Sequence, residues 1–233
     1  MLKPLEDKRD HRGDVMLAVL LACCAGATNG IALRAAGVFA ASMTGNVSWM
    51  ADQLEMGLGR PAAFFAAVIA SFIFGAFCCA GVAAKGPGEH RSAVYAACLF
   101  AEAAGVAACA VVRDTTLLCC ALAFLMGWQN SLATTLTGAR VRATHLSGIC
   151  TDVGIELSAL VASRAGVADA AAHRWRRIVL GAVTIAAFFT GALLGCLAYR
   201  RVAALALVFV AAVLAGIAAS GYRMATRRQS ITS

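Results

Sequence analysis

The sequence is poor in charged residues and has little proline. Only 14% of its 233 residues are Asp, Glu, Lys or Arg, and it contains 3 prolines. A soluble domain has about 25% charged and about 45–50% apolar residues, whereas 61% of this chain is apolar. The shortage of charge therefore argues against an ordinary soluble domain and predicts helices that lie in lipid.

Other absences remove whole classes of function. No basic surface interleaved with aromatic residues is present, so nucleic acid is not an expected partner. The 10 cysteines form no paired Cys-x-x-Cys motifs, so no metal or other cofactor is predicted. An enzyme is not expected either. His145 and Ser147 lack the flanking glycines of a nucleophile elbow, and no acid dyad lies within the apolar stretches.

Six apolar stretches are nearly free of charge, and each approaches the roughly 20 residues that cross a membrane as a helix. They are residues 15–33, 61–84, 92–112, 115–139, 178–199 and 202–222. The segment before the first stretch has mixed charge and no small-residue cleavage site, so we expect a retained span rather than a signal peptide. We predict an all-α integral membrane protein with about six transmembrane helices. Its expected parts are a cytoplasmic tail (1–14), one membrane domain (15–222) and a basic cytoplasmic tail (223–233).

The 20 Lys and Arg residues divide unevenly between the two sides of six predicted spans. On the side of both termini lie 15 of them: Lys3, Lys8, Arg9, Arg12, Lys85, Arg91, Arg140, Arg142, Arg164, Arg174, Arg176, Arg177, Arg223, Arg227 and Arg228. The other 5 are Arg34, Arg60, Arg113, Arg200 and Arg201. Eight spans would give a weaker division of 13 against 7. The positive-inside rule then predicts a multi-pass protein of the inner membrane, with both termini in the cytoplasm and the lipid bilayer as a partner.

Similar phrases recur in the two halves of the chain and predict an internal duplication. The matching segments are 26–29 with 127–130, 43–45 with 146–148, and 72–76 with 188–192, at offsets of 101, 103 and 116. Each half (15–112 and 115–222) would hold three spans, and since three is odd, the second half would enter from the opposite face. Inverted repeats of this kind occur in many secondary transporters, but a purely architectural duplication would leave the same pattern.

Each half also contains a polar segment that is neither a clear loop nor a clear span. These segments are 35–56 and 143–163. Glycine and small polar residues disfavour helix interiors, so breaks are predicted at 44–46 and 147–148, with Thr151 or Asp152 capping the following helix. Broken backbone at membrane depth must be buried in protein or line a watery cavity, which favours re-entrant segments. Helices on the membrane surface and full crossings are the alternatives.

Polar residues at matching points of the two halves form the predicted site. Amides and hydroxyls suit hydrogen bonding to a small polar solute, and they are costly in a lipid-facing wall. The predicted solute-binding residues are Asn29, Thr44, Gly45, Asn46, Gln129, Asn130, Ser147, Gly148 and Thr151. The predicted proton-coupling residues are Glu102, His145 and Asp152. The alternatives are a structural hydrogen bond for Glu102 and a solvated loop for the other two.

Three phrases together carry a family resemblance. They are Met43-Thr44-Gly45-Asn46, Gly127-Trp128-Gln129-Asn130, and the run Thr144-His145-Leu146-Ser147-Gly148-Ile149-Cys150-Thr151-Asp152-Val153-Gly154-Ile155-Glu156-Leu157. Over roughly residues 15–222, the chain resembles the YoaK-like family of small bacterial multi-pass membrane proteins. That family often has His before Met-Thr-Gly-Asn, where this chain has Ser42. The resemblance implies the membrane fold and no established activity.

Two classes of function remain after these exclusions. A secondary transporter or facilitator of a small polar solute explains both the duplication and the paired polar segments. A non-transport membrane scaffold or assembly protein explains the duplication alone. The sequence leaves open the identity of the solute and whether the protein forms a homo-oligomer.

Overall fold

The computed structural model describes residues 11–84, 91–137, 145–162 and 168–232, and within these ranges every regular element is helical. The elements are α1 (His11–Ala36), α2 (Met43–Glu55), α3 (Gly59–Ala83), α4 (Arg91–Cys109), α5 (Thr115–Thr137), α6 (Leu146–Ala162), α7 (Ala168–Val202), the 3-10 turn η2 (Ala203–Leu205) and α8 (Ala206–Thr232). Helices occupy all six apolar stretches, and α2 and α6 occupy the polar segments. Most of the expected tail 1–14, and the start of the second polar segment, lie outside the described residues. The helix α8 continues through the expected tail 223–233 as far as Thr232.

Four ranges of the described chain are long and apolar enough to cross a membrane. They are Val15–Ala36, Gly59–Ala83, Thr115–Thr135 and Ala171–Arg223. The last range contains both α7 and α8, which η2 separates. A shorter apolar helix, Ala93–Cys109, lies within α4. The expectation of an all-helical membrane protein is confirmed at this level.

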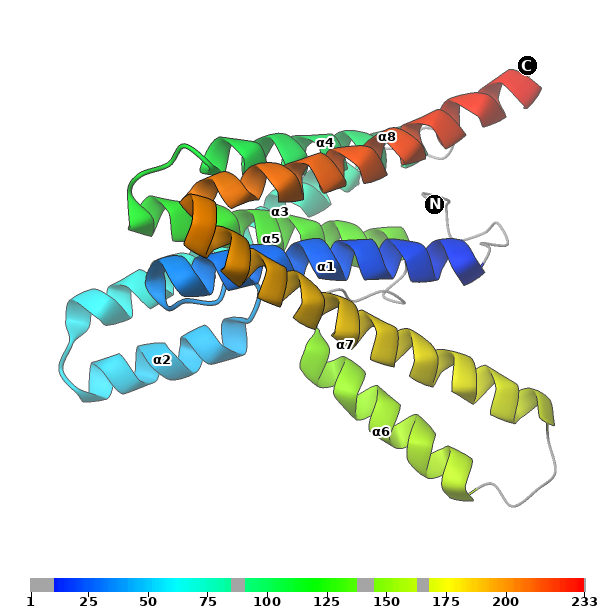
Figure 1. Ribbon diagram of the computed structural model, residues 1–233, viewed down its shortest axis with the longest axis horizontal. Helices are drawn as coiled ribbons and strands as arrows, with labels where there is room; N and C mark the ends of the chain where they lie inside the picture. Colours follow the sequence, from blue (N-terminus) through cyan, green and yellow to red (C-terminus); the bar gives the residue numbers. More distant parts are fainter. Residues whose placement is uncertain (1–10, 85–90, 138–144, 163–167, 233) are drawn as a thin grey trace.

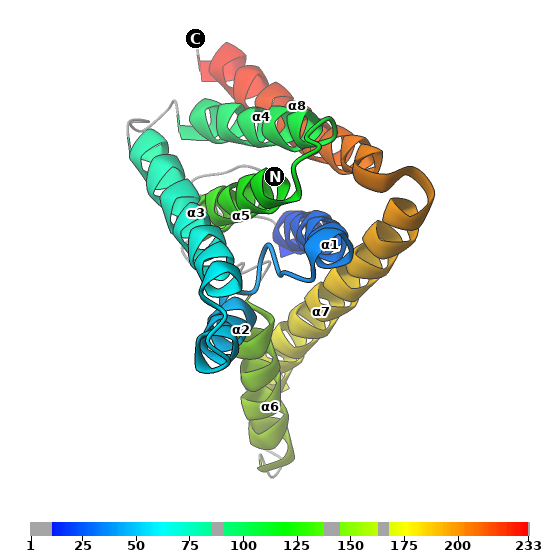
Figure 2. The same ribbon diagram turned by 90° about the vertical axis from the view of Figure 1, so that its left-hand side faces the viewer.

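The long helices of the first half each have an opposing counterpart in the second half (Figure 1). α1 and α5 run in opposite directions, and so do α3 and α7, and α4 and α8. Seen along the bundle, α1 and α5 lie near the centre, α3 and α7 flank them, and α4 and α8 close one side (Figure 2). The short helices α2 and α6 lie on the opposite side, where they pack on α3 and α7.

The two halves hold each other through glycines at which helix backbones touch. α1 crosses α7, and α3 crosses α5; at these crossings a Cβ on any of six glycines would collide with a carbonyl oxygen of the partner helix. Four glycine–carbonyl pairs correspond between the two crossings: Gly26 with Phe188, Gly191 with Cys23, Gly127 with Phe72, and Gly75 with Phe124. Adding 101 to the α1 residue numbers and 116 to the α3 residue numbers gives the corresponding residues of α5 and α7. Each of these four contacts therefore has a corresponding contact at the other crossing, and we call these contacts reciprocal. The α1–α7 crossing has two more, Gly30 with Ala192 and Gly195 with Ala27. Burying apolar surface gains little in lipid, where close backbone packing is a main source of helix association.

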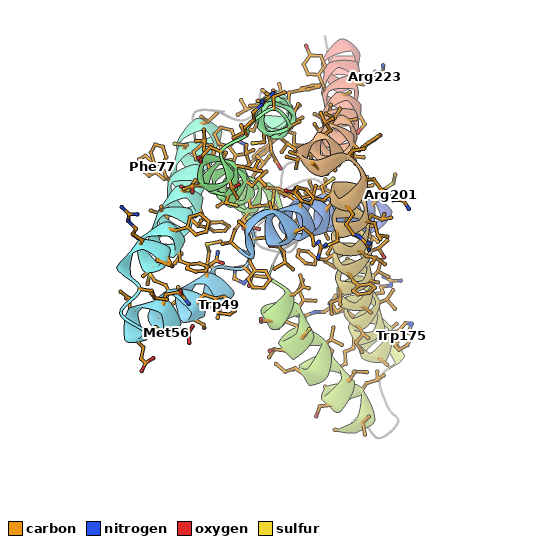
Figure 3. The ribbon with its side chains drawn as sticks, turned by 60° about the vertical axis from the view of Figure 1, so that its left-hand side comes forward. Trp49, Met56, Phe77, Trp175, Arg201 and Arg223 are labelled. Atoms are coloured by element: carbon orange, nitrogen blue, oxygen red, sulfur yellow. The ribbon has the colours of Figure 1, made fainter. Side chains whose placement is uncertain are left out.

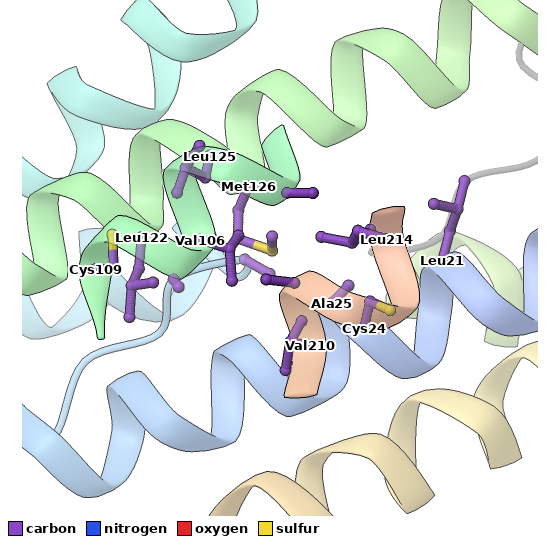
Figure 4. Packing of buried hydrophobic residues seen from close by; sticks show 14 of the residues in the cluster. Leu21, Cys24, Ala25, Val106, Cys109, Leu122, Leu125, Met126, Val210 and Leu214 are labelled. Atoms are coloured by element: carbon purple, nitrogen blue, oxygen red, sulfur yellow. The ribbon is translucent and has the colours of Figure 1, made fainter. Parts of the chain in front are cut away.

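A continuous core lies between α1, α4, α5 and α8 (Figure 4). Most of its side chains are aliphatic or small, and the aromatic exceptions are Phe65 and Tyr95. Its members include Leu21, Cys24, Ala25, Val106, Cys109, Leu122, Leu125, Met126, Val210 and Leu214. All 10 cysteines are free and 5 of them are buried, where a thiol packs as a small apolar group. α1 is the most enclosed of the candidate spans, so the core is built around it.

Large apolar side chains cover the outer faces of the long helices. Phe77 on α3 and Phe209 on α8 are 73% and 70% exposed, and Figure 3 shows Phe77 projecting away from the bundle. Trp49 on α2 and Trp175 on α7 are also exposed. A contiguous apolar exterior of this kind suits a lipid environment and would promote aggregation in water.

Gly75→Val is expected to destabilise the fold, because its Cβ would meet the carbonyl of Phe124 and force α3 away from α5. Overpacking of this kind costs about 1–3 kcal/mol or more. The matched control is Gly81→Val on the same helix, where an added Cβ meets nothing within 4 Å. Thermal unfolding of the purified protein in detergent should show a clear loss for Gly75→Val only. Equal melting of both variants would contradict the glycine contact.

Candidate functional site

The segment between α1 and α2 turns back along α1. Gly37 follows the end of α1 with φ of 70°, a left-handed conformation that glycine adopts without strain. The N–H of Ala41 then donates to Oδ1 of Asn29 at 3.0 Å. Asn29 lies seven residues before Ala36, the end of α1, which is roughly 10 Å back along the axis at 1.5 Å per residue. The chain therefore re-enters the bundle before α2 begins.

Gly45 and Asn46 hold Phe39 within this re-entering segment. The fully buried Asn46 side chain accepts a hydrogen bond from the Phe39 N–H at 3.1 Å and donates one to the Phe39 carbonyl at 2.6 Å. A Cβ at Gly45 would lie 2.9 Å from Cδ2 of the Phe39 ring, so the absence of a side chain at this position leaves room for the ring. The break predicted at 44–46 is wrong in position. α2 runs through these residues and the irregular backbone precedes them, because the first turn of a helix tolerates small polar residues.

The backbone break predicted at 147–148 is also wrong in position. α6 begins one residue after His145, so Ser147 and Gly148 lie in its first turn rather than at a break. Thr151 and Asp152 lie within α6 rather than at its cap. The Thr151 hydroxyl donates to the carbonyl of Ser147 at 3.0 Å, which lets a residue that favours caps remain inside a helix.

An ion-pair cluster fixes α6 to α7. Glu156 is buried, with its Oε2 3.2 Å from Nη1 of Arg174 and its Oε1 2.9 Å from Nη1 of Arg177. Nearer the start of α6, the side chains of Ile149 and Val153 lie against Gly181 of α7. Hydrogen bonds between a carboxylate and guanidinium groups are charge-assisted, and they are roughly twice as strong as neutral hydrogen bonds. α6 is therefore attached to α7 along most of its length.

A cavity of about 170 Å³ lies where the amino-terminal ends of α2 and α6 meet. Its lining residues are Ala41, Ser42, Met43, Thr44, Phe72, Asn130, His145, Leu146 and Ser147. Both polar segments contribute to the cavity. At the offset of 103, Ser42 corresponds to His145 and Thr44 to Ser147.

The cavity presents hydrogen-bond donors, and no acidic residue lines it among the residues described. The first N–H groups of a helix have no intrahelical acceptor and carry partial positive charge. Both α2 and α6 turn this end toward the cavity, and neither has an acid in its first turn. The Ser42 hydroxyl makes no capping hydrogen bond to α2. Such a lining suits a small solute with exposed acceptor atoms.

The predicted site residues fall into separate regions of the structure. Four line the cavity: Thr44, Asn130, His145 and Ser147. Three hold the segment before α2: Asn29, Gly45 and Asn46. Two lie in the bundle and do not line the cavity: Glu102 and Gln129. Three lie on α6 outside the lining: Gly148, Thr151 and Asp152.

Sequence reasoning missed several residues that matter here. Ser42, Met43 and Phe72 line the cavity without having been predicted. Ser42 could have been found, because the offset that aligns the two halves pairs it with His145. The Glu156 anchor was missed as well, although its acid and the arginines that it binds lie on consecutive helices, 18 to 21 residues apart. Phe72 left no comparable signal in the sequence.

The fold and the cavity define the class of this molecule. It is an all-helical membrane protein with reciprocal contacts between its halves and a small polar cavity between two short helices. The chain belongs to the family described as "Protein of unknown function (DUF1275)", whose model matches residues 17–220. This match extends from α1 to most of α8. The chain matches no curated protein and no solved structure.

Asn46→Leu is expected to loosen the segment before α2, because it removes both hydrogen bonds to Phe39. Leaving such backbone groups unpaired costs about 1–3 kcal/mol. Ser48→Ala is the matched control, because this exposed hydroxyl bonds only to the carbonyl of Thr44 within α2. Thermal unfolding in detergent and limited proteolysis at 37–42 should separate the two variants. A native melting profile and cleavage pattern for Asn46→Leu would contradict the anchoring role.

Proposed function

We propose that this protein is a secondary transporter or facilitator of a small polar solute in the inner membrane, and that it is a YoaK-like member of its family. The observation that carries the proposal is the polar cavity of about 170 Å³ to which both halves contribute. In many transporters the substrate lies where two repeats meet and the amino-terminal ends of broken helices point at it. A compact solute with exposed oxygen atoms, such as a small carboxylate, suits the donors of this lining.

In the proposed topology, the six long helices cross the membrane as two inverted three-helix repeats. α2 and α6 have 13 and 17 residues, which gives lengths of about 20 and 25 Å, short of the roughly 30 Å hydrocarbon core. They run outward from the cavity in opposite directions, as half-crossing re-entrant helices would (Figure 1). The reciprocal glycine contacts support the two-fold relation, and the uneven Lys and Arg distribution supports cytoplasmic termini.

The proposed topology predicts on which side of the membrane a reporter lies when it is fused at each of three positions. Fusions at Glu89 and Ser233 should report the cytoplasm, and a fusion at Asp114 should report the opposite side. One crossing separates Glu89 from Asp114, and three crossings separate Asp114 from Ser233. Paired alkaline phosphatase and fluorescent protein reporters provide the measurement. An external Ser233 would exclude the inverted repeat.

Filling the cavity is expected to stop transport. Ser147→Trp introduces a ring into a cavity of about 170 Å³, and flux should fall to the level of protein-free liposomes. Thr151→Trp is the matched control, because Thr151 is exposed one turn further along α6 and does not line the cavity. The measurement is uptake into liposomes containing the purified protein, screened with small carboxylates, amides and sugars.

Two outcomes of this screen would count against the proposal. Equal flux through Ser147→Trp and Thr151→Trp would remove the cavity from the transport path. No flux for any solute in a broad panel would favour the non-transport scaffold, which needs the helix contacts but not the cavity. Size-exclusion chromatography of each variant establishes that the protein is folded before flux is compared.

A further inference from the structure

We propose that Glu102 binds a proton in the core of the bundle, and that the amide oxygen of Gln129 accepts the hydrogen bond of the protonated carboxyl group. Glu102 on α4 and Gln129 on α5 are each 1% exposed. Within the described part of the chain, neither carboxyl oxygen of Glu102 has a hydrogen-bond partner, and neither does Oε1 of Gln129. Three buried acceptor oxygens thus lack a donor. A proton on Glu102 creates an O–H donor, which is the group that this cluster lacks.

Two hydrogen bonds place Gln129 at the level of Glu102. Nε1 of the adjacent Trp128 donates to the carbonyl of Cys98 at 3.1 Å, one turn before Glu102 on α4. Nε2 of Gln129 donates to the carbonyl of Leu21 on α1 at 3.3 Å, which leaves its Oε1 as the bare atom. These bonds fix α5 against both α4 and α1. Cys24, three residues after Leu21 on α1, interacts electrostatically with Glu102, so the carboxyl group also faces α1 near this level. On these grounds we pair the Gln129 amide with the carboxyl group.

Among the residues that the structure describes, no positively charged group is found to interact with Glu102. The titratable groups that interact electrostatically with Glu102 are the thiols of Cys24 on α1, Cys79 on α3 and Cys98 on α4. α8 packs along α4 and carries no acidic or basic residue between 206 and 221. Along α5, the described residues 115–135 contain no charged side chain. A buried carboxylate without a cation is strongly unfavourable, so the bound proton keeps the group neutral.

The ligand of this site is a proton, because the site offers too few oxygen ligands for a metal ion. Binding converts the carboxylate and a proton from water into a neutral carboxylic acid, and release returns the proton to water. Hard cations take six or more oxygen ligands, whereas the bare atoms here number three. Asp152, the other acid considered for proton coupling, is exposed on α6 and so lacks the enclosure that Glu102 has. As a coupling site for transport, Glu102 rests on the proposed function; its occupancy by a proton does not.

Infrared spectroscopy of the purified protein, with 13C-labelled glutamate, tests the occupancy directly. At neutral pH, the wild type should show a protonated-carboxyl C=O band that shifts with the label. The band should be lost in Glu102→Gln and should move to higher wavenumber in Gln129→Leu, which cannot accept the hydrogen bond. Glu55→Gln, which changes an exposed acid on α2, is the matched control and should leave the band unchanged.

Several results would overturn the proton site. One is the absence of a labelled band in the wild type; another is its persistence in Glu102→Gln. Loss of the band on adding sodium would show that a metal ion occupies the site. An unshifted band in Gln129→Leu would remove Gln129 as the partner. If Glu102→Gln does not fold, the label shift in the wild type together with the Gln129→Leu shift still decides the question.

Liposome flux separates this proposal from the proposed function. Where a transported solute is found, Glu102→Gln should abolish the pH dependence of uptake and retain binding of the solute. A labelled band without flux for any solute would refute transport and leave the proton site intact. Flux without a band would leave transport intact and refute the proton site.

Discussion

Backbone contact at glycine is the interaction on which the rest of this structure depends. Each of the two tightest crossings, α1 with α7 and α3 with α5, joins one helix from each half of the chain. A side chain at any of the six glycines there would separate the backbones. Since lipid is as apolar as the helix surfaces, burial alone cannot hold such pairs together. The positions of α4, α8 and the two short helices follow from these crossings, because each packs on a helix that takes part in one.

The short helices α2 and α6 are held to the bundle by different polar groups. Backbone that enters a membrane protein without regular structure must have its N–H and carbonyl groups satisfied internally. Before α2, the amides of Asn29 and Asn46 do this for Ala41 and Phe39. In the second half, Ile149 stands at the position that corresponds to Asn46, and α6 is instead anchored through Glu156. Two of the three phrases that carry the family resemblance, 43–46 and 144–157, thus contain residues that hold helices in place.

The long elements could be predicted because hydropathy and charge act over about 20 residues at a time. The pairing of the halves was also visible, since glycines recur at fixed offsets. The start of α2 could not be predicted, because Gly45 and Asn46 act on Phe39 through contacts that local propensity does not describe. For the same reason, Asn46 was predicted to bind solute, yet its amide is used by the backbone of the chain. Matching polar residues across the repeat identified Thr44, Ser147, Asn130 and His145, which share the cavity.

The two walls of the cavity are not alike, although they derive from corresponding segments. Ser42 places a hydroxyl where the other half has the imidazole of His145, and Thr44 stands where the other half has Ser147. A ligand of the proposed site would therefore meet an imidazole on one side and a hydroxyl on the other. Its two ends would be bound through different groups, although the two walls correspond in sequence, so a ligand with chemically different ends would have one preferred orientation in the cavity.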